Sequence, residues 1–267
     1  MSLRFVFTLG LAGLVGLGST LAAQTRDDDP CRDRGWDDNE FTFCEVRDQT
    51  LAAGPLDVNA GPNGGIRVEG WDRNEILVRA IVTAHARSEA DAKQLASGVQ
   101  IVAGSGRVSS SGPSSGRREW WSVSFRINVP RQTDLDLNAH NGGISIAGVS
   151  GTIRFDTNNG GVRLANLAGD VRGATHNGGL NVQLDGQRWD GIGLDVETTN
   201  GGVTLAIPDG YNAELTTATS NGGFRTDYPM TIQGELSPRR GLTTTLGSGG
   251  SPVRVRTTNG GLKISRR

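Results

Sequence analysis

The sequence is poor in aromatic residues, in methionine and in net charge. Of its 267 residues, 5% are aromatic and 2 are methionine, whereas 40 are glycine. Glycine at about twice its average usage suits short strands joined by tight turns and argues against a helical bundle. The formal net charge is −1, so no basic field attracts nucleic acid, and we predict no nucleic-acid partner.

Long hydrophobic runs are also lacking after the N-terminus. The apolar run from Phe5 to Gly18 is too short for a comfortable membrane span. Small residues up to Ala23 follow it, which predicts a signal peptide over residues 1–23 with cleavage after Ala23; a retained N-terminal anchor is the alternative. We therefore expect an exported chain in the periplasm, at the cell surface or outside the cell, with no membrane span after cleavage.

Only two cysteines are present, Cys31 and Cys44. In an exported chain, two thiols this close in sequence predict a disulfide, which would stabilise the fold by about 3 kcal/mol. A metal site is the alternative, but no nearby histidine or further cysteine completes one. We interpret residues 24–50 as an irregular leader tied down by this disulfide.

An Asn-Gly-Gly tripeptide recurs along the chain. Its asparagines are Asn63, Asn141, Asn159, Asn177, Asn200, Asn221 and Asn259. The successive spacings are 78, 18, 18, 23, 21 and 38 residues. Apolar and polar residues alternate on both sides of each turn, which is typical of half-buried strands. Each unit is therefore predicted to be a strand, the Asn-Gly-Gly turn, a second strand and a looser turn.

Two all-β architectures could use this unit. Asn-Gly between alternating runs favours hairpins and an antiparallel β-sandwich or meander. A period of about 18–23 residues instead favours a β-solenoid, in which each unit is one coil stacked on the next. Stacked coils place equivalent residues about 4.8 Å apart, which explains why threonine recurs two residues before the last five asparagines. We favour the solenoid.

The N-terminal part, residues 51–130, is less regular than the repeat region at 131–267. Apolar strands are predicted over 75–83, 98–103 and 121–129. Ser88 is a plausible N-cap for a short helix at 88–96. Residues 104–116 are rich in glycine and serine and are predicted to form a mobile loop.

These motifs resemble those of a known family. A signal peptide precedes Asn-Gly-Gly-Ile-x-Val at Asn63, a short helix, a strand ending in Val129-Pro130-Arg131, and Leu135-Asp136-Leu137 leading into repeated turns. In this order they are similar to the bacterial "putative adhesin" family of β-strand-repeat domains, over residues 51–267. The resemblance implies a β-helix-like fold and an envelope or extracellular location, and it brings no catalytic residues.

One aromatic residue is a candidate ligand contact. Because Trp121 is expected to face inward, its neighbour Trp120 should face outward beside Arg117 and Arg118. A tryptophan flanked by guanidinium groups could stack on a sugar or bind an anionic polymer. The alternative is that Trp120 covers a loop or the leader segment.

The histidines do not indicate a metal site. His140 and His176 precede repeat asparagines two units apart, so in a solenoid they would stand about 9–10 Å from each other, too far to share one ion. His85 has no evident partner in the sequence. The glycine turns continue into apolar strands rather than into calcium-binding repeats. We predict no metal and no cofactor.

The last repeat ends close to the C-terminus, which suggests an exposed edge strand there. Lys263, Arg266 and Arg267 are interpreted as charges that prevent edge-to-edge aggregation. The alternative is a docking edge for a partner strand.

We therefore expect a non-enzymatic binding or scaffolding protein of the cell envelope. Its partner would be an envelope polysaccharide or an envelope protein, and its oligomeric state is left open. One alternative is a carbohydrate-active enzyme that uses Asp195 with Glu197, or Asp136 with Asp156, as an outward carboxylate pair. A second alternative is a purely architectural spacer.

Overall fold

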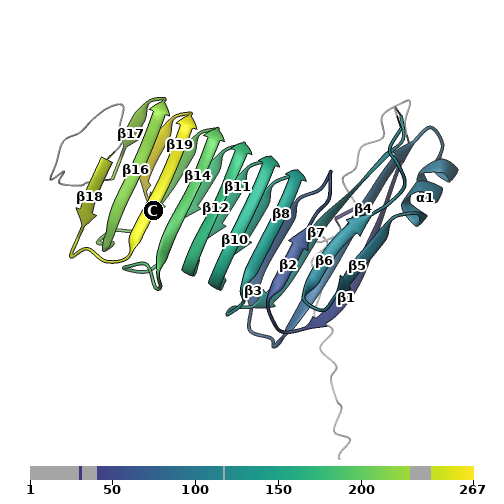
Figure 1. Cartoon of the computed structure of the whole chain (residues 1–267), viewed down its shortest axis with the longest axis horizontal. Coiled ribbons are helices and arrows are strands. Elements are labelled where there is room, and N and C mark those ends of the chain that lie inside the picture. The colour runs from purple at the N-terminus through teal and green to yellow at the C-terminus, as the bar shows by residue number, and fades with distance from the viewer. Residues whose placement is uncertain (1–29, 32–40, 117, 229–241) are drawn as a thin grey trace, which may run out of the picture. The chain divides into compact units, whose positions relative to one another are not determined.

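The computed structural model in Figure 1 describes residues 30–31, 41–116, 118–228 and 242–267. The chain divides into two compact units, Met1–Pro30 and Cys31–Arg267, and the description below concerns the second. The expected signal peptide over residues 1–23 lies outside the described residues, so it stays a prediction.

The described residues form twenty strands and one helix, and the strands belong to two sheets of ten. In spatial order, the first sheet contains β1 (Phe41–Ala52), β4 (Glu75–Ala86), β7 (Trp120–Pro130), β3 (Ile66–Trp71), β9 (Ile144–Ala147), β11 (Val162–Ala165), β13 (Leu180–Gln183), β15 (Val203–Ile207), β20 (Leu262–Arg266) and β17 (Phe224–Thr226). The second contains β18 (Leu242–Leu246), β16 (Ala213–Asn221), β19 (Pro252–Asn259), β14 (Gly193–Asn200), β12 (Ala168–Asn177), β10 (Ser150–Asn159), β8 (Leu135–Asn141), β2 (Leu56–Asn59), β6 (Arg107–Ser111) and β5 (Gln100–Gly104).

Each Asn-Gly-Gly unit contributes one strand to each sheet. Equivalent positions pair in parallel, so Ile153 of β10 lies between Leu135 of β8 and Val171 of β12. Aliphatic side chains of both sheets, such as Leu137 and Ile146, form one buried core. The all-β prediction is confirmed and the arrangement is solenoid-like. The antiparallel sandwich or meander does not hold for the repeats, because their strands pair in parallel across units.

The repeat asparagines form a continuous hydrogen-bonded ladder. Each side-chain Nδ2 donates to the Oδ1 of the asparagine in the preceding coil of the stack, at 2.8–3.2 Å. The spatial order is Asn63, Asn141, Asn159, Asn177, Asn200, Asn259 and Asn221. The threonines also connect coils, but through the backbone: Thr175 Oγ1 donates to the carbonyl oxygen of Gly160 at 2.8 Å. The asparagine and threonine that recur at fixed positions in the sequence therefore make the contacts between coils.

From Gly142 onward, the first glycine of each turn is required by close stacking rather than by its backbone angles. A Cβ added to Gly178 would lie 2.0 Å from the carbonyl oxygen of Gly160, and one added to Gly201 would lie 2.0 Å from that of Gly178. Neither Gly178 nor Gly201 has a positive φ. Only a residue without a side chain lets the backbones approach this closely.

The C-terminal coil lies inside the stack, so the interpretation of β20 as an edge strand is wrong. β20 pairs with β15 on one side and β17 on the other, and β19 pairs with β14 and β16. Figure 1 draws β19, in yellow, between β14 and β16. The side chains of Lys263, Arg266 and Arg267 form ion pairs with Asp227, Asp209 and Asp185, respectively.

The N-terminal part differs from its prediction in two places. Residues 41–50 belong to the long strand β1, which pairs along its length with β4, so the irregular leader predicted for 24–50 is wrong over this stretch. Five of the thirteen residues of the predicted loop at 104–116 form β6 (Arg107–Ser111), where Val108 is fully buried between β5 and β2. The first coil, β2 with β3, already stacks on β8 and β9, so the segment 75–130 is an insertion between the first two coils.

The predicted helix is present as α1 (Glu89–Ser97). Ser88 caps it, with its Oγ accepting a hydrogen bond from the Asp91 amide at 3.1 Å. At the other end, Arg47 of β1 donates to the carbonyl oxygens of Ala96 at 2.9 Å and Val99 at 2.5 Å. A cation at this end stabilises the helix because the last carbonyls carry partial negative charge.

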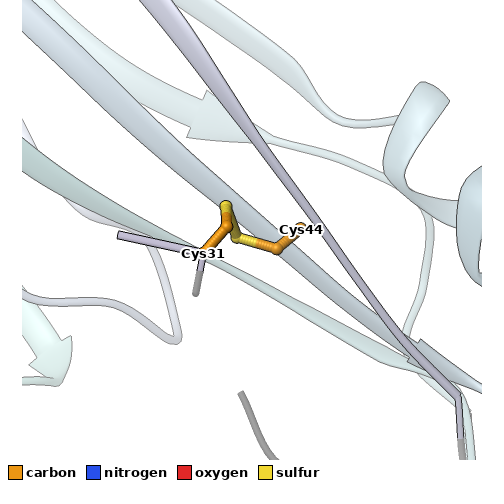
Figure 2. The surroundings of a disulfide bond; sticks show 2 residues. All are labelled: Cys31 and Cys44. Atoms are coloured by element: carbon orange, nitrogen blue, oxygen red, sulfur yellow. A yellow bond between two sulfur atoms is a disulfide. The ribbon is translucent and has the colours of Figure 1, made fainter. Parts of the chain in front are cut away.

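The disulfide between Cys31 and Cys44 is formed (Figure 2), as the sequence predicts. Cys44 lies on the outward face of β1 beside Thr83 of β4. The disulfide therefore attaches the start of this unit to the outer face of the first sheet.

Candidate functional site

The outer face of the first sheet carries the predicted aromatic contact. Trp121 points inward and is 6% exposed, whereas Trp120 points outward and is 38% exposed. The ring of Trp120 stacks on His85 with a centroid distance of 3.7 Å and an interplanar angle of 17°. Thr42 Oγ1 lies 2.9 Å from His85 Nδ1. We call Thr42, His85 and Trp120 the aromatic patch.

The aromatic patch is assembled by strand pairing. Its three residues face one another across β1, β4 and β7, because Thr42 pairs with His85 and His85 with Trp120. His85 thus has two partners that the sequence did not reveal, since the antiparallel register of β4 and β7 joins segments about 35 residues apart. The stack holds the indole in a fixed orientation, and a fixed, exposed indole can stack on the apolar face of a sugar ring.

Of the two arginines proposed beside Trp120, the structure describes Arg118. Arg118 is exposed and lies in the tight turn before β7, where the Gly116 amide donates to the Glu119 carbonyl oxygen at 2.7 Å. Arg117 lies outside the described residues. A role of Arg118 with Trp120 in ligand contact stays a prediction.

The carboxylate pairs lie on the opposite outer face, in a shallow hollow of about 400 Å³ over β8, β10, β12, β14 and β19. Asp195 and Glu197 both pair with Arg256, whose Nη2 lies 2.9 Å from Asp195 Oδ1 and 3.2 Å from Glu197 Oε2. Asp136 instead accepts a hydrogen bond from Asn138 at 3.1 Å. Asp195 and Glu197 therefore form ion pairs rather than flank an open space for a sugar.

Two further arginines that line the hollow, Arg154 and Arg172, pair with Asp170. Asp170 accepts from Arg154 Nη2 at 2.5 Å and from Arg172 Nε at 3.0 Å. The hydrogen bond from Arg154 holds the pKa of Asp170 below its ordinary value, although partial burial opposes this. A general acid at neutral pH needs a raised carboxyl pKa, so Asp170 is unsuited to that role.

A larger open cavity, about 770 Å³, lies where β1 joins β2. Its lining includes the apolar residues Leu51, Pro55 and Leu56 and the charged residues Asp136 and Arg154. The sequence offered no signal for this cavity, because its walls come from segments that are distant along the chain.

The histidines of the repeats are placed as the stacking predicts. His140, Asn158 and His176 precede paired asparagines on the adjacent strands β8, β10 and β12. Within the described ranges, no group of three or more histidine, cysteine, aspartate or glutamate side chains is arranged to hold a metal ion. In the same ranges, no helix has the length and apolar character needed to cross a membrane.

Comparison with known proteins places these features in context. A family model described as "Toastrack DUF4097" matches residues 55–265. Similar solved structures include a "putative cell adhesion protein" from Clostridium sporogenes ATCC 15579, which is 12% identical, with 84% of this chain and 100% of that chain covered and a TM-score of 0.43. A "putative adhesin" from Bacteroides fragilis NCTC 9343 is 11% identical, with 84% and 97% covered and a TM-score of 0.37. Among curated proteins, nothing matches this chain.

Proposed function

This chain belongs to the Toastrack DUF4097 family, and we propose that it acts as an exported, non-enzymatic protein that binds or scaffolds components of the cell envelope. Coils of about 18–23 residues would repeat the same outward positions at regular intervals along the stack. Such regular faces suit contact with an extended or repetitive partner, either an envelope polysaccharide or an envelope protein.

The observation that carries this proposal is the aromatic patch. Trp120 is 38% exposed and is held against His85 on the outer face of a sheet. Large aromatic side chains that are exposed and rigid are enriched at binding sites, because they offer contact area with little loss of conformational entropy. The carboxylate pair Asp195 and Glu197 supports catalysis less well, because Arg256 pairs with both.

The test measures retention of the exported protein on separated envelope fractions: peptidoglycan, outer-membrane lipids, surface polysaccharide and membrane proteins. The full chain is expressed from its own start, and N-terminal sequencing of the exported product should begin at Gln24. We expect saturable retention on one fraction. Trp120→Ala should weaken that retention, because the substitution removes the exposed ring while Trp121 keeps the core contact.

A matched control separates the aromatic patch from general surface apolarity. Ile192 is 68% exposed and lies next to β14, so Ile192→Ala also removes an exposed apolar side chain but leaves the patch intact. Ile192→Ala should bind like the wild-type chain. Retention on no fraction would refute the binding proposal and favour the architectural spacer. Cleavage of a polysaccharide that is lost in Asp195→Ala with Glu197→Ala would instead establish the enzyme alternative.

A further inference from the structure

One outward row of the first sheet is rich in basic residues. Strand pairing places ten residues side by side, in the order Asp48, Arg79, Arg126, Arg67, Ser145, Arg163, Asn181, Thr204, Lys263 and Arg225. Six of these are arginine or lysine and one is acidic. We call them the basic row. Because neighbouring strands lie about 4.8 Å apart, the six cations extend over roughly 38 Å.

Half of the cations in the basic row have no carboxylate partner. Arg79 pairs with Asp48 at 3.0 Å, Lys263 pairs with Asp227 at 3.5 Å, and Arg67 pairs with Glu69. Arg126, Arg163 and Arg225 are exposed, and in the part of the chain that the structure covers none of these three forms an ion pair. Their charges are therefore available to an anionic ligand.

The second sheet shows less of this imbalance. Most of its outward arginines are matched by carboxylates: Arg107 with Asp57, Arg154 and Arg172 with Asp170, and Arg256 with Asp195 and Glu197. Arg254 of β19 is exposed and forms no ion pair within the described residues. The formal net charge of −1 thus conceals an uneven distribution, in which one face carries a line of unpaired positive charge.

Along the repeat strands, most residues on both sides of the basic row are small. On one side are the second glycines of the turns: Gly65, Gly143, Gly161, Gly179, Gly202, Gly261 and Gly223. On the other side are Glu69, Ala147, Ala165, Gln183, Ala206, Ser265 and Asp227; Glu69 and Asp227 are the carboxylates that pair with Arg67 and Lys263. Stacking does not require Gly161, Gly179 or Gly202, because a Cβ there would meet its neighbour at an ordinary 3.5 Å. A flat floor of this kind lets a long chain lie close along the row.

We propose that the basic row binds a linear acidic polysaccharide that runs across the strands. This inference rests on the proposed binding function and names its partner. Carboxylates of the polymer pair with Arg126, Arg163 and Arg225, since guanidinium groups match carboxylates in geometry and charge. Ser145 and Thr204 supply hydrogen-bonding groups for sugar hydroxyls between the charges. The spacing of adjacent strands is close to the length of one sugar residue in an extended chain.

The row fits other polyanions less well. Proteins that bind single-stranded nucleic acid place aromatic side chains along the path of the strand, and the ten positions of the basic row include no aromatic residue. Membrane-surface binding combines basic residues with large apolar anchors, whereas the flanks of this row are mainly glycine and alanine. The combination of unpaired guanidinium groups with small and hydroxyl-bearing neighbours favours a carbohydrate.

The experiment compares two triple variants of the full chain on immobilised alginate, a polyuronate, with dextran as the uncharged probe. Arg126→Gln, Arg163→Gln and Arg225→Gln together remove the unpaired charges of the row. Arg107→Gln, Arg172→Gln and Arg254→Gln remove the same charge from the second sheet. We expect the first variant to bind alginate at least about tenfold more weakly and the second to stay within about twofold of wild type. Dextran should not be retained, and added salt should weaken binding to alginate.

The outcomes distinguish this inference from the proposed function. Equal losses in the two triple variants would show that net charge alone controls binding and would overturn the basic row as a site. Stronger binding to phosphatidylglycerol vesicles than to alginate would overturn the polysaccharide assignment. If the wild-type chain is retained on an envelope fraction but ignores alginate, the inference fails and the proposed function stands. Retention on no fraction and no alginate binding would refute both.

Discussion

Replacing Gly178 with alanine tests whether close stacking of the coils holds the fold together. The new Cβ would lie 2.0 Å from the carbonyl oxygen of Gly160, about 1 Å closer than such contacts occur. Relief requires the two coils to separate locally. That separation would stretch three hydrogen bonds: Gly160 N to Asn177 O at 3.0 Å, Thr175 Oγ1 to Gly160 O at 2.8 Å, and the Asn177 to Asn159 side-chain bond at 2.8 Å.

The cost follows from the number of bonds affected. At about 1 kcal/mol for each hydrogen bond, Gly178→Ala should lower the free energy of unfolding by about 3 kcal/mol. For a domain of this size, each kcal/mol shifts Tm by roughly 2–4 °C, so a fall of about 6–12 °C is expected. Thermal unfolding followed by circular dichroism, with a denaturant titration, measures both quantities.

Gly179→Ala is the matched control, one residue away in the same turn. Its Cβ would lie 3.5 Å from the carbonyl oxygen of Gly202, which is ordinary contact. Alanine also restricts the unfolded chain, so stability should stay the same or rise by up to about 1 kcal/mol. Equal effects of the two substitutions, or a larger loss from Gly179→Ala, would refute the argument that stacking selects the first glycine.

Three further predictions concern other parts of the fold. Deleting residues 252–267 removes β19 from between β14 and β16, and β20 from between β15 and β17, so the chain should lose cooperative unfolding and aggregate on gel filtration; a monomer that unfolds like wild type would contradict the internal position. Replacing Cys31 and Cys44 with serine should lower the free energy of unfolding by about 3 kcal/mol, measured with denaturant and reproduced by a reductant in the wild type. Because the pKa of Asp170 is lowered, its ionised form stabilises the fold above the ordinary pKa of 3.8, and this contribution is lost as the pH falls below that value. The stability difference between wild type and Asp170→Asn should therefore be largest near neutral pH and shrink in acid.

Much of the repeat could be predicted because its signals are local. Alternating residues such as Ile153 and Phe155 face the core, and the intervening charges face solvent, as period-2 patterning requires. The constant position of asparagine and threonine pointed to stacked coils, and the structure shows the hydrogen bonds that link them. The helix after Ser88 and the disulfide were likewise readable from short segments.

For the aromatic patch, the local sequence predicts the orientation of Trp120 but not its partner. Alternation placed Trp120 outward and Trp121 inward, as the structure has them. The partner of Trp120 could not be read, because His85 reaches it only through the antiparallel pairing of β4 with β7. The basic row was missed for the same reason, since its cations are scattered from Arg67 to Lys263 and meet only through strand registers.

The sequence by itself determined the all-β class, the strand–turn–strand unit and the direction in which each side chain of a repeat points. These depend on interactions within about ten residues and on a pattern repeated many times. Only the tertiary structure decided the order of the coils, in which the last repeat enters between its two predecessors, and which strands became edges. Parallel coils of the same design present nearly equivalent edges to one another. The choice of neighbour therefore depends on the packing of the whole stack rather than on any single segment.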